Sequence, residues 1–359
     1  MVLSVLNEPL RSIGNCELLE KIADTGLGEV YKARDRATGE IVAVKIMPPF
    51  RADNQLAFQR FARECRILSA LNDPHIIRAL DFGIDGTRSY LVMEFAEGES
   101  LGQRLAREGR LAEAEAIRLI AEVAGALGRA HSKGLVHRNV KPDKILITAD
   151  GKTKLTDLGL IRQVETQHDL TRAGTVVGTP NFMAPEQLYN ADKATRHCDI
   201  YSLAATLYMV VTGEVPFGGC NPADMWARKL RNDLPPARTL VPALSERIDR
   251  AIRRAMSTEP EKRPADCAAF VQDLTGEGAL PTDPGSFAGD QPPSKPIPLQ
   301  VPGPHASSSE RTAAPTTVKP PAPPEKGVGH GEGDRWAMVL AVIGVVVAGF
   351  LSGLFLFVR

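Results

Sequence analysis

The distribution of proline divides this chain into parts that cannot fold alike. Thirteen of its 27 prolines fall within residues 281–324, interleaved with serine, threonine, glycine and alanine. A segment of this composition cannot bury enough apolar surface to offset the entropy lost on ordering it. Residues 278–335 are therefore predicted to form a disordered linker. The linker either acts as a spacer or presents polyproline turns to an SH3- or WW-like module.

Residues 336–358 contain no charged side chain over 23 positions. As a helix they would extend about 34 Å, which is enough to cross a bilayer. The alternative is a buried core helix, but a segment that follows a disordered linker has no domain to be buried in. One C-terminal transmembrane helix is therefore expected. Its Gly349 and Gly353 form a GxxxG spacing, which either supports a homodimer or reflects only the abundance of small residues in membrane helices.

The composition of the remaining chain favours a reduced, cytosolic domain. The formal net charge is zero, so no bulk electrostatic attraction to nucleic acid is expected. The five cysteines are far apart and form no C-x-x-C motif, which is typical of free thiols. The first ten residues lack the long apolar core of an export signal. The expectation is a single-pass membrane protein whose globular part, residues 16–277, faces the cytoplasm.

Apolar periodicity within residues 16–277 changes repeatedly between strand and helix patterns, which indicates the α+β class. Residues 41–46 alternate as a strand, residues 61–68 read as a helix, and residues 90–96 read as a second strand. Apolar residues then recur at helical spacing over 111–132. This region is long enough for one two-lobed domain.

The same region contains five short motifs in a fixed order. They are IADTGLGEVY at 22–31, VAVK at 42–45, HRNVKPDK at 137–144, DLG at 157–159 and GTPNFMAPE at 178–186. In this order they resemble bacterial serine/threonine protein kinases of the eukaryotic-like (Hanks) type. The resemblance covers nearly three-quarters of the chain. It implies a small lobe at about 16–96 and a large lobe at about 97–277. It also implies that Asp199 braces the catalytic loop and that Arg263 pairs with Glu186.

The resemblance also implies an ATP site. The residues carried over to nucleotide binding are Ala23, Gly28, Val30, Ala43, Lys45, Glu64, Met93, Glu94, Ala96, Lys144 and Asp157. Lys45 would contact the α- and β-phosphates and pair with Glu64, and Asp157 would bind one Mg²⁺. The alternatives are that Lys45 is an ordinary surface lysine and that Glu64 is a solvated glutamate. Ala23 and Thr25 replace two glycines of the kinase loop, and their side chains should stiffen it.

Residue 139 departs from the family pattern at the catalytic position. Kinases place there the aspartate that accepts the proton of the substrate hydroxyl, whereas this chain has Asn139. An amide is not a base near neutral pH, and general-base assistance is worth about 3–5 kcal/mol of barrier. Lys141 matches the catalytic-loop lysine and, with Thr179, the serine/threonine branch. Asp143 is a candidate substitute base, although kinases usually have an outward-facing residue at this position.

Residue 144 departs from the pattern as well, because Lys144 replaces the asparagine that holds a second Mg²⁺. A divalent ion about 4 Å from an ammonium group would be repelled by about 8 kcal/mol at an effective dielectric of 20. A second ion should therefore be excluded or held weakly. Either the ammonium group takes the place of that ion and neutralises phosphate charge, or Lys144 points to solvent and the site is inert.

Thr171 and Thr175 lie in the activation segment, where a phosphate on either could pair with Arg138. Thr179 is a third candidate for regulation in this segment. If the chain is inactive, another kinase would have to add the phosphate. The alternative is that these threonines remain unmodified.

The sequence is compatible with three functions. The first is a membrane-anchored pseudokinase that regulates protein partners. The second is a weak or unconventional ATP-dependent serine/threonine kinase, whose phosphate transfer would disappear in Lys45→Met. The third is a scaffold in which the membrane helix and the linker cluster partners and the kinase-like lobe is a passive docking module.

Overall fold

The computed structural model describes residues 11–25, 28–47, 55–158, 180–189 and 194–276. Several predicted features lie outside these residues. They are the threonines at 171, 175 and 179, the linker, the segment at 336–358 and its two glycines. Among the described residues, no helix has both the length and the apolar character to span a bilayer.

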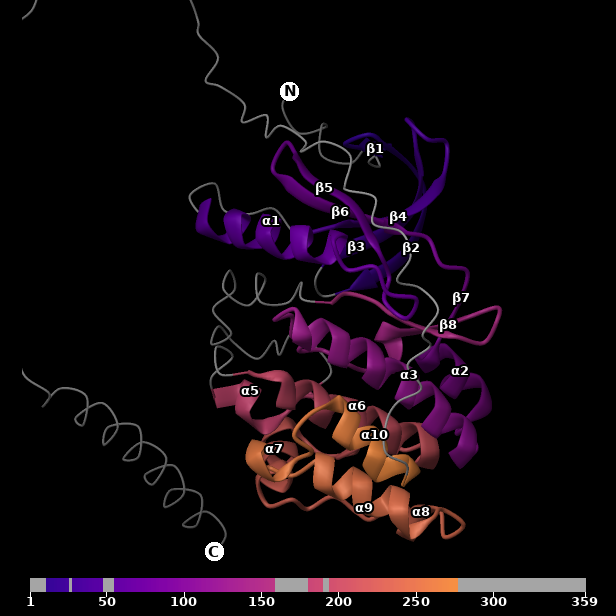
Figure 1. The fold of residues 1–359 in the computed structure, drawn as a ribbon, viewed down its shortest axis with the longest axis vertical. Helices are drawn as coiled ribbons and strands as arrows, with labels where there is room; N and C mark the ends of the chain where they lie inside the picture. The colour runs from indigo at the N-terminus through magenta and orange to yellow at the C-terminus, as the bar shows by residue number, and fades with distance from the viewer. Residues whose placement is uncertain (1–10, 26–27, 48–54, 159–179, 190–193, 277–359) are drawn as a thin grey trace, which may run out of the picture. The chain divides into compact units, whose positions relative to one another are not determined.

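The small lobe is built on a six-stranded antiparallel sheet with the order β1-β2-β3-β4-β6-β5. One helix, α1, lies along this sheet (Figure 1). The Phe61 ring of α1 meets the Phe82 ring of β5 edge to face, with centroids 6.0 Å apart. The elements are β1 (Ser12–Ile13), β2 (Cys16–Thr25), β3 (Gly28–Asp35), β4 (Ile41–Ile46), α1 (Gln55–Ser69), β5 (Ala79–Asp85) and β6 (Arg88–Glu94).

The large lobe is mainly helical, with the small sheet β7-β8-β9 close to the small lobe. Its strands are β7 (Gly98–Ser100), β8 (Ile145–Thr148) and β9 (Thr153–Leu155). Its helices are α2 (Leu101–Glu108), α3 (Glu113–Ser132), α5 (Pro185–Tyr189), α6 (Arg196–Thr212), α7 (Pro222–Leu230), α8 (Ala237–Leu240), α9 (Glu246–Ala255) and α10 (Cys267–Thr275), with 3₁₀ turns η1 (Pro142–Lys144) and η3 (Pro260–Lys262).

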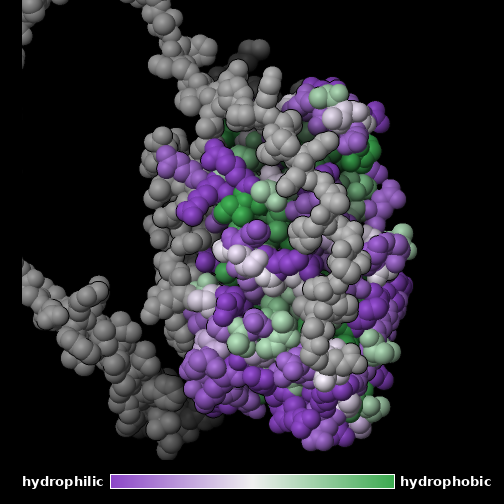
Figure 2. Space-filling model, viewed as in Figure 1, coloured by the Kyte–Doolittle hydropathy of each residue, from purple (hydrophilic) through white to green (hydrophobic). Residues whose placement is uncertain are grey.

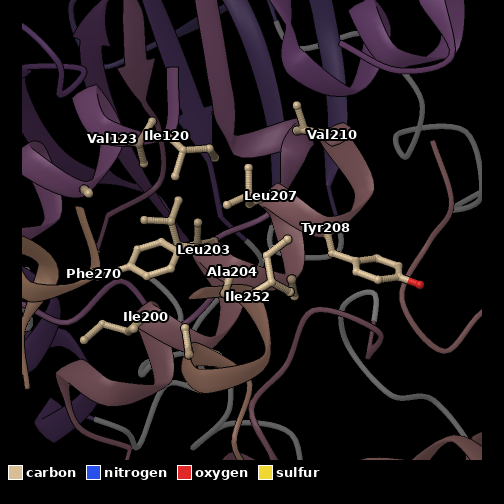
Figure 3. Close-up of a cluster of buried hydrophobic side chains, with 14 of the residues drawn as sticks. Ile120, Val123, Ile200, Leu203, Ala204, Leu207, Tyr208, Val210, Ile252 and Phe270 are labelled. Carbon is tan, nitrogen blue, oxygen red and sulfur yellow. The ribbon is translucent and has the colours of Figure 1, made fainter. Parts of the chain in front are cut away.

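The core of the large lobe forms around α6, which is buried along nearly its whole length. A helix that is apolar on all sides has to lie at the centre of a lobe. Leu203 and Leu207 of α6 are among the side chains clustered with Val123 of α3 and Phe270 of α10 (Figure 3). The outer helices are amphipathic, and hydrophilic residues cover the end of the lobe over α8 and α9 (Figure 2). The predicted two-lobed α+β fold is confirmed.

Candidate functional site

A cavity of about 860 Å³ is lined by residues of both lobes. Most of the residues predicted to bind nucleotide lie on its wall: Ala23, Val30, Ala43, Met93, Glu94, Ala96, Lys144 and Asp157. Arg138, Asn139 and Lys141 also line it. Gly28, Lys45 and Glu64 are not part of the wall. The structure therefore brings together residues that are more than 100 positions apart in the chain.

The alternation of β4 explains how the small lobe contributes to this site. Val42, Val44 and Ile46 pack into the core on one face of the sheet. Ala43 and Lys45 consequently point to the opposite face. Ala43 lies opposite Met93 in the register of β4 with β6. Lys45 is fully buried and extends from this face toward the large lobe, where it reaches Asp157.

The cavity wall includes apolar residues that were not predicted from the sequence. Among them are Ile77, Phe95 and Leu146. The ammonium nitrogen of Lys32 lies 4.7 Å from the centre of the Phe95 ring, which is a cation–π contact at this wall. Leu146 could have been found from β8, because its neighbours Ile145 and Ile147 are both in the large-lobe core. A strand that buries both neighbours presents the residue between them to the other side.

Glu94 ties the two lobes together at the end of β6. Its carboxylate forms an ion pair of 2.7 Å with Lys154 of β9. The same carboxylate accepts a hydrogen bond of 3.1 Å from the backbone N–H of Arg78. The side chain is thus held by the protein itself, and the predicted role of Glu94 toward nucleotide rests on its backbone.

Two lysines hold one carboxylate in the interior of the site. Nζ of Lys45 lies 2.8 Å from Oδ1 of Asp157, and Nζ of Lys144 lies 2.5 Å from Oδ2. All three side chains are less than a tenth exposed. Lys144 therefore does not point to solvent. Each oxygen of Asp157 accepts a hydrogen bond from a different ammonium group, and such charge-assisted bonds are among the strongest in proteins.

The protonation of this trio follows from its charges. Burial by itself would raise the pKa of Asp157, but the ammonium groups of Lys45 and Lys144 outweigh burial and hold it far below its ordinary value. Burial lowers the pKa of Lys45, an effect that Asp157 opposes and Lys144 reinforces. The carboxylate is thus firmly ionised, and its negative charge is shared by two cations.

Glu64 lies half-buried on α1. The resemblance implies that it pairs with Lys45. In the part of the chain that the structure describes, the ion pair of Lys45 is the one with Asp157, and Glu64 makes other interactions. The sequence pattern places both residues in the right elements, but it does not determine which carboxylate the lysine reaches.

The loop that carries Asn139 is held by Asp199 of α6. This buried carboxylate accepts the backbone N–H groups of His137 at 2.8 Å and Arg138 at 2.6 Å, and it lies 2.8 Å from Nε2 of His131. The predicted brace is therefore present. Arg138 and Asp157 both have positive φ angles, of 68° and 62°. Such backbone is costly for residues other than glycine and is found where the surroundings enforce it.

His137 joins this loop to the segment that carries Asp157. Its Nε2 lies 2.8 Å from the carbonyl oxygen of Thr156, and its Nδ1 lies 3.3 Å from the backbone N–H of Asn139. Burial lowers the pKa of His137. A neutral ring that donates from Nε2 and accepts at Nδ1 satisfies both contacts. This imidazole thus has a structural role.

Asn139 presents an amide to the cavity, where a base would have to act. The nearest candidate substitute in the sequence is Asp143, whose side chain is 63% exposed and forms an ion pair of 3.4 Å with Lys141. This carboxylate is thus exposed to solvent and already engaged with a lysine. In the described part of the loop, an amide stands at the position of the base.

The kinase-type Mg²⁺ ions can be tested against these side chains. Residue 144 offers an ammonium group in place of an oxygen ligand, and both oxygens of Asp157 already accept hydrogen bonds from cations. A second ion does not fit this set of residues. A single ion at Asp157 would have to displace at least one of the two ammonium groups.

Two further contacts hold the end of the activation segment. Arg263 and Glu186 form the predicted pair, with N–O distances of 2.6 and 2.8 Å. Lys229 of α7 was not predicted: its ammonium group donates to the carbonyl oxygens of Pro180, Asn181 and Met183 at 2.7, 2.9 and 2.5 Å. It also lies over the rings of Tyr201, Phe217 and Trp226. The signal in the sequence is its spacing of four from the buried Met225 on α7.

The sequence profile of the protein kinase domain family matches residues 16–274. This chain belongs to the protein kinase family. It is 33% identical over 297 residues to the serine/threonine-protein kinase PknL of Mycobacterium tuberculosis, which covers 82% of this chain and 70% of PknL. It is 34% identical to PknH of Mycobacterium bovis over 82% of this chain and 49% of PknH. These relatives place the kinase domain in the bacterial Hanks-type serine/threonine group.

Other relatives are matched over a smaller part of their length. The kinase domain is 32% identical to the probable serine/threonine-protein kinase pknA2 of Bifidobacterium longum, over 75% of this chain but only 36% of pknA2. Among solved structures, Rad53 1–466 in complex with AMP-PNP aligns with a TM-score of 0.61 and 27% identity, over 72% of this chain and 64% of that one. The kinase domain of Mycobacterium tuberculosis PknI aligns with a TM-score of 0.60 over 75% of this chain and 99% of that one, at 24% identity.

Proposed function

We propose that this protein is a membrane-anchored pseudokinase, which binds ATP without transferring its phosphate and which regulates or scaffolds protein partners. The observation that carries the proposal is the state of Asp157: both of its oxygens are held by ammonium groups. In kinases the corresponding aspartate binds metal. The amide of Asn139 removes the base from the same site, which by itself raises the barrier by about 3–5 kcal/mol.

A weak or unconventional serine/threonine kinase is the second candidate. It is favoured by the machinery that remains in place: the buried Lys45, the Asp199 brace and the Arg263–Glu186 pair. A domain that keeps this scaffold positions its substrates even without a base. Positioning alone contributes strongly to phosphoryl transfer.

The deciding experiment incubates purified full-length protein with radiolabelled ATP, Mg²⁺ or Mn²⁺, and a generic basic protein. Lys45→Met serves as the control that removes the phosphate-binding lysine. The pseudokinase proposal expects no labelling above that control. Labelling by the wild type that disappears in Lys45→Met would overturn it and establish the second candidate.

Membrane anchoring belongs to the proposal through residues 336–358, with the kinase domain on the cytoplasmic side and a homodimer formed through Gly349 and Gly353. Deletion of 336–358 should move the protein from the membrane fraction to the soluble fraction. Gly349→Leu should leave it in the membrane but abolish crosslinking between copies. If the deletion removes all function while variants of the cavity have no effect, the chain is a scaffold with a passive kinase domain.

Regulation by phosphorylation is also proposed. A phosphate on Thr171 or Thr175 would give Arg138 a strong partner, and in a pseudokinase another kinase would have to supply it. Thr179 is included as a further position. Mass spectrometry of the protein from its native host tests this, and bare threonines under all growth conditions would remove the idea.

A further inference from the structure

Lys144 is fixed in place by the backbone around it. It ends the short 3₁₀ turn η1, where its N–H donates to the carbonyl of Lys141 at 2.9 Å. Its own carbonyl accepts the N–H of Thr156 at 2.9 Å. Thr156 immediately precedes Asp157, so the backbone that carries the lysine is bonded to the backbone beside the carboxylate. The ammonium group cannot leave Asp157 by a movement of this turn without breaking these bonds.

The interior of the site has an excess of positive charge. Lys45 and Lys144 share a single buried carboxylate, Asp157. Each ammonium group has three N–H donors. Within the described ranges, each has one protein acceptor, an oxygen of Asp157. Lys144 also lines the cavity, so its remaining donors have access to a bound molecule.

The other charged groups near this end of the cavity do not cancel the excess. Arg138 and Lys141 line the same wall; Asp143 pairs with Lys141, and the buried Asp199 accepts the backbone N–H of Arg138, so these four groups add no net charge. Of the other carboxylates on the wall, Glu94 is paired with Lys154 and Asp24 with Lys21, and Glu97 is the third. A cavity with unsatisfied cationic donors attracts an anion with several acceptor oxygens, such as a polyphosphate. The same charges repel a divalent cation.

We infer that this site binds nucleotide in its metal-free form, with Lys144 carrying out the charge neutralisation that Mg²⁺ provides in active kinases. The inference rests on the nucleotide binding included in the proposed function. It adds the chemical form of the ligand: a nucleoside triphosphate whose phosphates are not complexed with metal. Added Mg²⁺ competes with Lys144 and Lys45 for the phosphate oxygens, so it weakens binding or leaves it unchanged.

The test measures the affinity of full-length protein for ATP by titration calorimetry, in EDTA and in excess Mg²⁺. The expected dissociation constant in EDTA is equal to or lower than that in Mg²⁺. Lys144→Ala should weaken metal-free binding by about tenfold or more, the loss expected for one hydrogen bond to a charged group. Lys144→Asn, which restores the kinase residue, should make binding depend on Mg²⁺.

Lys152→Ala is the matched control. Lys152 lies on the neighbouring hairpin, its side chain is 63% exposed, and it pairs with Asp150. Its removal should leave ATP affinity unchanged in both buffers. Thermal unfolding of each variant shows whether a lost affinity reflects a lost fold, and the comparison of EDTA with Mg²⁺ in the wild type needs no variant.

The inference is overturned if wild-type protein binds ATP only with Mg²⁺, if it binds no ATP in either buffer, or if Lys144→Ala binds metal-free ATP as well as the wild type. These failures differ from a failure of the pseudokinase proposal. Phosphate transfer by the wild type would refute the pseudokinase whatever the metal dependence of binding. Absence of binding would refute this inference and the ATP binding in the proposed function, but not the absence of phosphate transfer that defines the pseudokinase.

Discussion

The ammonium nitrogen of Lys144 lies 2.5 Å from Oδ2 of Asp157. The other oxygen of that carboxylate accepts from Lys45 at 2.8 Å. One substitution, of asparagine by lysine at residue 144, thus changes two kinase elements. It removes an oxygen ligand from the catalytic loop, and it covers the aspartate thirteen positions away that would otherwise bind metal.

Restoring the base should not restore a kinase by itself. Asn139→Asp returns the carboxylate, a change worth about 10²–10⁴-fold where the rest of the site is competent. Lys144 still occupies Asp157 in that variant. We expect the double variant Asn139→Asp/Lys144→Asn to transfer more radiolabelled phosphate than either single variant. Equal transfer by Asn139→Asp and the double variant would show that Lys144 does not obstruct the metal.

Asp157 should stabilise the fold, because it is the counter-charge of two buried lysines in the site. Asp157→Asn leaves two buried ammonium groups without a counter-charge, which we expect to lower the free energy of unfolding by about 3–5 kcal/mol. Asp150→Asn is the matched control, because its carboxylate is 58% exposed and should change stability by no more than about 0.5 kcal/mol. Urea unfolding of both variants makes the comparison. A similar stability for the two variants would mean that the lysines find water or lose their protons at low cost.

Gly28 is expected to be irreplaceable for a steric reason. Its φ is +126°, and a Cβ at this position would lie 2.2 Å from the carbonyl oxygen of Ile46. Gly28→Ala should therefore destabilise the protein by about 3 kcal/mol or more, since both backbone and packing are strained. At Gly151 φ is +78° and nothing lies within 4 Å, so Gly151→Ala should cost only about 1 kcal/mol. Thermal melts decide, and equal losses would contradict the steric argument.

Lys229 should make stability depend on pH. Burial lowers its pKa to about 7, from an ordinary value of 10.5. Between these values the unfolded chain holds a proton that the folded protein has lost, so raising the pH favours the folded state. The dependence approaches about 1.4 kcal/mol per pH unit. Below pH 7 both states are protonated and this contribution no longer changes.

The measurement compares urea unfolding of the wild type and Lys229→Met, which lacks the titrating group. From pH 7 to pH 8.5 the difference in unfolding free energy should move in favour of the wild type by at most about 2 kcal/mol. Lys152→Met, at an exposed position, should show no such change relative to the wild type. A constant difference would mean that Lys229 keeps its proton, because its three carbonyl partners match the three N–H groups of the charged form.

The order of motifs in the sequence was sufficient to predict the fold, and many of the predicted site residues line one cavity. Alternation in IVAVKI determines that Ala43 and Lys45 share a face, and the β4–β6 register then sets Ala43 beside Met93. The Arg263–Glu186 pair and the Asp199 brace, carried over from the family resemblance, are both present. The identities of Asn139 and Lys144 predict damaged chemistry, and this prediction awaits the phosphate-transfer assay.

The direction of Lys144 was decided only by the tertiary structure, as was the role of Lys229. The local sequence pattern determines whether a residue lies in a strand or a helix and on which face of it, because side chains repeat every 2 residues along a strand and every 3.6 along a helix. The partner of a buried charge depends on which groups the packed lobes bring within about 3 Å of it, and Lys45 and Asp157 are 112 positions apart. Sequence left two directions open for Lys144. Packing selected the carboxylate because a lysine buried there must be paired with an anion.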